Sequence, residues 1–81
     1  MKVRVLLFAA LREAAGTGEV FLELADGTDV SGLREELIRA HPGLAAYLPH
    51  AKAAVNRRLV DGKTVLVQGD EVAFLPPVGG G

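Results

Sequence analysis

The chain is short, nearly neutral and rich in apolar residues. Its 81 residues carry nine Lys and Arg against ten Asp and Glu, and 49% are hydrophobic. This composition excludes a disordered chain and predicts one small domain with a modest core. The balanced charge argues against a nucleic-acid partner, which requires clustered Lys and Arg. The absence of cysteine excludes a disulfide framework, a thiolate metal site and a cysteine nucleophile.

Nothing in the sequence indicates a membrane partner. The alternating pattern begins directly after Met1, without an apolar leader segment. No stretch approaches the roughly 18 apolar residues that a membrane span requires. We therefore expect a cytoplasmic protein.

The first part of the chain predicts a strand, a short helix and a second strand. Residues 2–8 alternate, with the odd positions facing the core. Residues 9–15 are strong helix formers and end at Gly16, which suits the left-handed end of a helix. Residues 19–24 resume a strand pattern that we expect to pair antiparallel with the first.

The main helix is predicted to begin at Val30, because the Asp29 carboxylate can accept hydrogen bonds from the free amides of the first turn. An apolar stripe at helical spacing predicts that one face packs on a sheet. The stripe consists of Val30, Leu33, Leu37 and Ile38. Pro42 and Gly43 end the helix just after His41.

The second half predicts three short strands at residues 52–56, 64–67 and 71–75, with a hairpin-like turn at Asp61 and Gly62. The segment between Pro42 and the first of these strands has no recognisable pattern. A long helical connection between an early hairpin and later strands is typical of an α+β roll, in which a mixed sheet packs on one main helix.

Residues with catalytic potential are sparse. Ser31 is the only serine and lies in a predicted first helical turn, and neither His41 nor His50 has a partner at metal-ligand spacing. The chain lacks a glycine-rich phosphate loop between a strand and a helix. We therefore expect no metal site, and no cofactor or nucleotide bound by this chain alone.

The most distinctive segment is the C-terminus. Pro76 and Pro77 stiffen the exit from the last predicted strand, and Val78 precedes three glycines that end at Gly81. Such a thin peptide can enter a narrow channel in another protein. We therefore divide the chain into a domain at residues 1–75 and an extended tail at residues 76–81. A terminal carboxylate is a poor electrophile, so acyl chemistry on it requires a partner enzyme.

Three stretches resemble the small subunit of molybdopterin synthase, the MoaD-type sulfur carriers of the ubiquitin-like β-grasp superfamily. These stretches are LLFAALREAAGTGE at residues 6–19, AAVNRRLV at 53–60 and GDEVAFLPPVGGG at 69–81. The resemblance covers essentially the whole chain and implies a β-grasp fold. Gly79 stands at the variable position of the tail motif, so the diglycine is Gly80 and Gly81.

The resemblance also implies a function in which the chain carries sulfur and is not catalytic alone. In this family a ubiquitin-activating-type adenylating enzyme (the MoeB type) uses ATP to activate the terminal carboxylate, here that of Gly81. A sulfur donor then converts it to a thiocarboxylate. The carrier docks on the molybdopterin synthase large subunit, and sulfur passes to cyclic pyranopterin monophosphate in molybdenum cofactor biosynthesis. Residues 76–80, from Pro76 and Pro77 through Val78 and Gly79 to Gly80, would be held in the channel of the partner.

A docking surface is predicted beside the tail. Strand alternation places Phe8 and Leu75 opposite the core-facing positions of their strands, and Leu59 lies near a turn. Monomers rarely leave such residues clustered in water. We expect these three side chains to contact the large subunit.

Three other functions remain open from the sequence. A sulfur carrier for thiamine thiazole synthesis or tRNA thiolation has the same fold and diglycine. A ubiquitin-like protein modifier, conjugated to lysines through Gly81, uses the same terminal chemistry. A structural interaction module would use the sheet without the tail.

Overall fold

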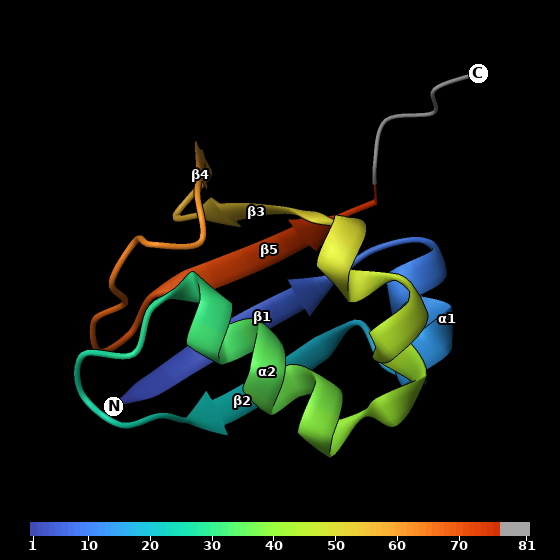
Figure 1. Ribbon diagram of the computed structural model, residues 1–81, viewed down its shortest axis with the longest axis horizontal. Coiled ribbons are helices and arrows are strands. Elements are labelled where there is room, and N and C mark those ends of the chain that lie inside the picture. Colours follow the sequence, from blue (N-terminus) through green and yellow to red (C-terminus); the bar gives the residue numbers. More distant parts are fainter. Residues whose placement is uncertain (77–81) are drawn as a thin grey trace.

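The computed structural model describes residues 1–76, and Figure 1 shows a mixed sheet with helices packed on one face. The strand order is β2-β1-β5-β3-β4. The central strands β1 and β5 are parallel, and the other neighbouring pairs are antiparallel. The strands are β1 (Lys2–Leu7), β2 (Glu19–Glu23), β3 (Lys52–Val55), β4 (Arg58–Val60) and β5 (Glu71–Leu75). The predicted α+β roll is therefore confirmed.

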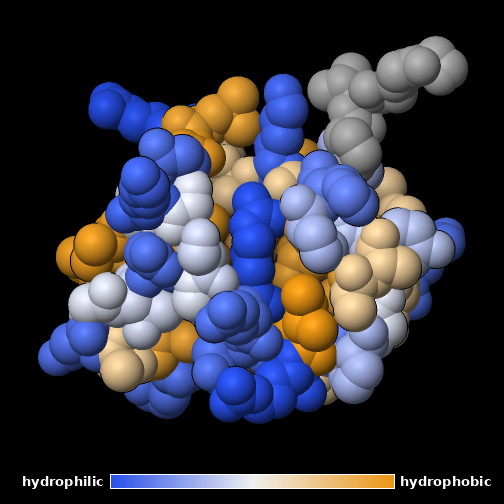
Figure 2. Space-filling view, viewed as in Figure 1, coloured by the Kyte–Doolittle hydropathy of each residue, from blue (hydrophilic) through white to orange (hydrophobic). Residues whose placement is uncertain are grey.

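Helix α2 (Val30–Ala40) crosses one face of the sheet and forms the core with it. Asp29 caps the helix as predicted, because its Oδ1 accepts a hydrogen bond of 2.8 Å from the Gly32 amide. Val30, Leu33 and Leu37 of the predicted stripe are fully buried. Figure 2, viewed from the α2 side, shows mainly hydrophilic side chains with small separate apolar areas.

Alternate side chains of the central strands β1 and β5 also belong to this core. Val3 and Val5 of β1 and Val72 and Phe74 of β5 are at most 1% exposed. The intervening residues therefore face away from α2, as predicted from the period of two. We call the face of the sheet that points away from α2 the outer face.

Helix α1 (Ala10–Ala15) follows β1 through a sharp turn. Ala9 turns the chain with φ 51° and ψ −126°, a conformation that suits glycine far better than alanine. Gly16 ends the helix with φ 78° and donates its amide to the Arg12 carbonyl, as predicted.

The predicted strand at residues 64–67 is wrong. The predicted turn at Asp61 and Gly62 is present, because the Thr64 amide donates a hydrogen bond of 3.3 Å to the Asp61 carbonyl, but it does not form a hairpin. The hairpin strand β4 instead follows a turn at Asn56 and Arg57, which have φ values of 49° and 72°. Residues 64–67 lie along the start of α2, where Val65 makes only an isolated bridge to Asp29. The sequence patterns of a strand and of an extended loop are alike, and only the presence of a neighbouring strand to pair with distinguishes them.

The segment without a sequence pattern forms two 3₁₀ helices, η1 (Pro42–Ala46) and η2 (Leu48–His50). Leu44 and Leu48 anchor these helices in the core. Arg34 of α2 donates a hydrogen bond of 2.7 Å to the Leu48 carbonyl, and its guanidinium lies 5.0 Å from the centre of the Phe74 ring. Burial lowers the pKa of Arg34 because it disfavours the charged form.

Two further observations concern residues 1–76 alone. None of their helices is long and apolar enough to cross a membrane. They also contain no group of three or more His, Cys, Asp or Glu placed to hold a metal ion. Pro77, Val78, Gly79, Gly80 and Gly81 lie outside the described residues, so the division into domain and tail stays a prediction.

Candidate functional site

The three predicted docking residues are exposed, Phe8 and Leu75 near the end of β5 and Leu59 two strands away on β4. Phe8 is 44% exposed, Leu59 65% and Leu75 37%. Leu7 pairs with Phe74, which places Phe8 and Leu75 at the same end of neighbouring strands. Helix α1 therefore does not cover Phe8.

The sheet register connects Leu59 to the other two residues. Leu59 pairs with Ala54, Ala54 pairs with Ala73, and Ala73 pairs with Leu6 across four neighbouring strands. The small side chains of the two alanines make the surface shallow between the larger side chains of Leu59 and Leu6. We call this surface the apolar half of the outer face. It consists of Leu6, Phe8, Ala54, Leu59, Ala73 and Leu75.

The two alanines of this surface were not predicted as part of it. Both stand at outward positions of an alternating pattern, and Ala73 shares its face with Leu75. Their pairing became visible only with the strand order, because Ala54 and Ala73 are far apart in the sequence.

The other end of the outer face is polar. Arg4 forms ion pairs with Glu19 on β2 and with Glu71 on β5, the latter at 3.2 Å between Nη1 and Oε2. The Lys2 ammonium lies 5.9 Å from the centre of the Phe21 ring. We call these five residues the charged half of the outer face; its Glu19, on the edge strand β2, pairs with Leu6 and reaches Arg4 with its side chain.

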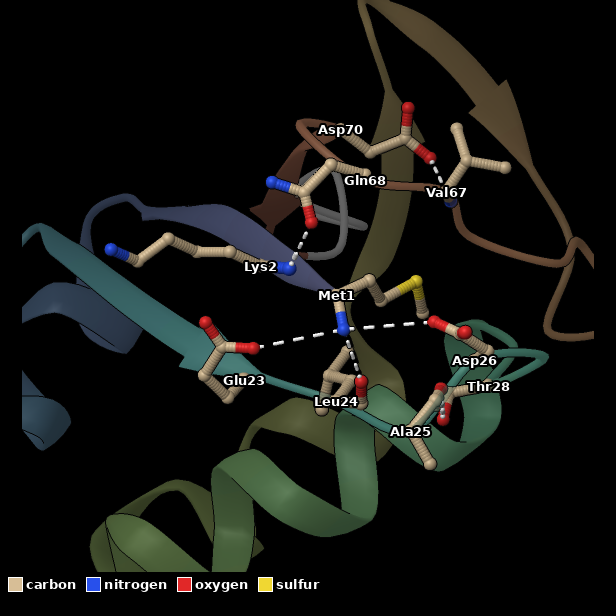
Figure 3. Close-up of polar contacts among 10 residues, drawn as sticks. All are labelled: Met1, Lys2, Glu23, Leu24, Ala25, Asp26, Thr28, Val67, Gln68 and Asp70. Atoms are coloured by element: carbon tan, nitrogen blue, oxygen red, sulfur yellow. Dashed lines mark hydrogen bonds and ion pairs between the residues drawn. The ribbon is translucent and has the colours of Figure 1, made fainter.

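A buried polar contact fixes β4 and therefore Leu59. Asp70 is 7% exposed, and its Oδ1 accepts a hydrogen bond of 2.9 Å from the Asn56 side chain. Its Oδ2 accepts a 2.8 Å bond from the Val67 amide, visible in Figure 3. Asn56 Oδ1 in turn accepts from the Glu71 amide at 3.0 Å. The hairpin turn is thus tied to the start of β5 by two side-chain hydrogen bonds.

The N-terminus occupies the end of β1 opposite the docking residues. Figure 3 shows the Met1 ammonium donating to the Leu24 carbonyl at 2.7 Å, with carboxylate oxygens of Glu23 and Asp26 at 3.6 and 3.7 Å. Polar groups therefore close that end of the sheet. Leu75, with Phe8 beside it, and the attachment point of the tail lie at the other end.

The tail begins where the apolar half ends. Leu75 is the last residue of β5, and Pro76 follows it directly. The reactive residue predicted from the resemblance, Gly81, and four predicted tail-binding residues, from Pro77 to Gly80, lie outside the described residues. Of the predicted tail residues, the structure places Pro76 alone, beside Leu75.

This arrangement suits binding and presentation of a chain end. A protein that contacts the apolar half meets the start of the tail at the edge of the same surface.

Comparisons with known proteins agree with this fold. The model of the ThiS family matches residues 5–81. The molybdopterin synthase sulfur carrier subunit of Mycobacterium tuberculosis is 43% identical over 100% of this chain and 99% of its own length. Subunit 1 in a complex of subunits 1 and 2 of the molybdopterin-converting factor of Helicobacter pylori matches with a TM-score of 0.72 and 30% identity, covering 100% of both chains.

A third similarity is to SAMP1 from Haloferax volcanii, with a TM-score of 0.89 and 28% identity over 100% of both chains. The fold is therefore a ubiquitin-like β-grasp. The chain belongs to the ThiS family, and molybdopterin synthase sulfur carrier subunits are among its full-length relatives.

Proposed function

We propose that this chain is the sulfur carrier subunit of a molybdopterin synthase and that Gly81 carries the sulfur as a terminal thiocarboxylate. The observation that carries the proposal is the position of the apolar half, which ends at the residue where the tail begins. The full-length similarity to sulfur carrier subunits of the same size supports it. The sulfur carriers of other pathways and the protein modifiers are not favoured by these relatives.

The chemistry would proceed on partner proteins. An adenylating enzyme of the ubiquitin-activating (MoeB) type would join the Gly81 carboxylate to AMP from ATP and release pyrophosphate. A sulfide equivalent from a sulfur donor would displace AMP and leave the thiocarboxylate. On the large subunit, the sulfur would pass to cyclic pyranopterin monophosphate, and water would restore the carboxylate.

The roles of this chain's own residues follow from that scheme. The apolar half would bind the large subunit, with Phe8, Leu59 and Leu75 as the main contacts. The absence of side chains at Gly79, Gly80 and Gly81 would let the end of the chain enter a narrow channel. The cytoplasmic location expected from the sequence stays a prediction.

The direct test uses intact-mass analysis of the carrier after incubation with the activating enzyme, ATP and a sulfur donor. We expect a mass gain on the C-terminal peptide equal to replacement of one oxygen by sulfur. Deleting Gly81, or adding one residue after it, should abolish sulfur transfer and leave the thermal midpoint unchanged, because a chain end contributes little packing. Sulfur transfer by the extended chain would contradict the proposal.

A second measurement tests the need for a partner. Calorimetric titration of the isolated chain with Mg-ATP should show no binding, since its sequence lacks a phosphate-binding loop. Micromolar affinity for Mg-ATP would mean that the chain takes part in its own activation.

A further inference from the structure

An apolar cavity lies beside Pro76, on the side of β5 away from the apolar half. Its volume is about 170 Å³. Its walls come from α1, from the two 3₁₀ helices and from the first tail residue, which meet at the end of β5 (Figure 1). The lining residues are Ala10, Leu11, Ala46, Tyr47, His50 and Pro76.

The walls of this cavity are held in place by close packing. A Cβ atom on Gly43 would lie 2.8 Å from the Ala14 carbonyl oxygen, so glycine permits η1 to approach α1 closely. Leu44 and Leu48 are fully buried on either side of Tyr47. The hydrogen bond from Arg34 to the Leu48 carbonyl fixes η2 on α2. The cavity is therefore preformed, as binding pockets usually are.

The length of the tail places this cavity inside a contact area. Five residues follow Pro76, and a fully extended chain of that length spans at most about 17 Å. Under the proposed function, a partner that encloses Gly81 therefore has its channel entrance within about 17 Å of Pro76. Tyr47, which is 49% exposed, lines the cavity together with Pro76.

We propose that the cavity receives one aliphatic or methionine side chain from the large subunit, located beside the entrance of its tail channel. The inference rests on the proposed function. The apolar walls favour an uncharged side chain, because a buried charge without a partner is costly. Together with the apolar half, this contact would hold the start of the tail on both sides and direct it into the channel.

The test fills the cavity without disturbing the core. Ala46 lines the cavity, whereas its neighbour Ala45 does not, and both are exposed on η1. Ala46→Leu should weaken binding to the purified large subunit by about tenfold or more, because the incoming side chain loses its site. Ala45→Leu is the matched control and should leave affinity unchanged. Equal affinities of the two variants would overturn the proposal.

A second measurement avoids substitutions altogether. In the wild-type chain, the amide resonances of Ala46 and Tyr47 should shift on addition of the large subunit, also when residues 77–81 are deleted. Unchanged resonances in a complex that forms through the apolar half would overturn the proposal even if Ala46→Leu failed to fold.

The outcomes separate this proposal from the proposed function. If wild-type chain acquires sulfur and binds the large subunit while both leucine variants bind equally well, only the cavity assignment fails. If Ala46→Leu weakens binding of the activating enzyme but not of the large subunit, the occupant is wrong. If the wild-type chain neither acquires sulfur nor binds the large subunit, the proposed function fails as well.

Discussion

The two halves of the outer face are built from the same central strands and differ in what covers them. At one end, half-buried Leu6 and Ala73 belong to a row of apolar side chains that ends at exposed Leu59. Two residues earlier along each strand, Arg4 and Glu71 form an ion pair that also includes Glu19. The period of two assigns all of these residues to one face. Cross-strand partners then decide whether that face is available for docking.

This contrast predicts where a partner binds. The charged groups of the charged half are already paired within the chain. A partner that broke or buried these ion pairs would gain little binding free energy. Side chains of the apolar half gain free energy whenever a partner removes them from water. We therefore expect the binding free energy to come from the half next to Pro76.

The largest expected effect is the loss of large-subunit binding in Phe8→Ala or Leu75→Ala. Each side chain buried in the complex contributes about 1.5–3 kcal/mol, so affinity should fall at least about tenfold. The thermal midpoint should change little, because both side chains are exposed in the free chain. Phe21→Ala, an exposed aromatic of the charged half, is the matched control. If Phe21→Ala weakened binding equally, the distinction between the halves would be lost.

The next effect concerns the contact that positions β4. Asp70→Ala removes an acceptor from the Asn56 side chain and from the Val67 amide. We expect it to lower the free energy of unfolding by about 1–3 kcal/mol, because two hydrogen bonds to a buried carboxylate are lost. Urea denaturation measures this change. Asp61→Ala, which removes an exposed carboxylate from the loop after β4, is the control and should cost less.

A smaller effect is expected at the turn that ends β1. Ala9→Gly should raise the free energy of unfolding by about 1 kcal/mol. Glycine removes the backbone strain of alanine at positive φ, and the conformational entropy that glycine loses on folding costs less than this strain. Ala10→Gly, within α1, should lower stability by a similar amount. Thermal denaturation of the pair measures both signs. A destabilised Ala9→Gly variant would show that the turn is unstrained.

The smallest effect is expected for Arg4→Ala in the charged half. Arg4 and its partners are substantially exposed, and surface ion pairs contribute less than about 1 kcal/mol. Stability should fall slightly, and less at high salt than at low salt. Affinity for the large subunit should stay within about twofold of wild type. A tenfold loss would place the charged half within the interface.

The site was only partly predictable from the sequence. Alternation within β1 and β5 was sufficient to predict that Phe8 and Leu75 are exposed, because both strands are central and one of their faces is buried against α2. Leu59 was predicted on weaker grounds, and its strand β4 was missed because Asn56 and Arg57 adopt left-handed conformations that neither residue type demands. The cavity beside Pro76 had no sequence signal, because its walls come from three separate segments.

The sequence by itself determined the features that depend on neighbouring residues: the alternation of the central strands, the Asp29 cap of α2 and the glycine that ends α1. It also determined the composition of the tail, where a chain without cysteine ends in glycines. The tertiary structure decided the features that depend on distant residues. Residues 64–67 became a loop because α2, and not another strand, lies beside them. Only the parallel pairing of β1 with β5 brought Arg4 to Glu71, and Phe8 to Leu75, because strand register joins residues that local patterns cannot relate.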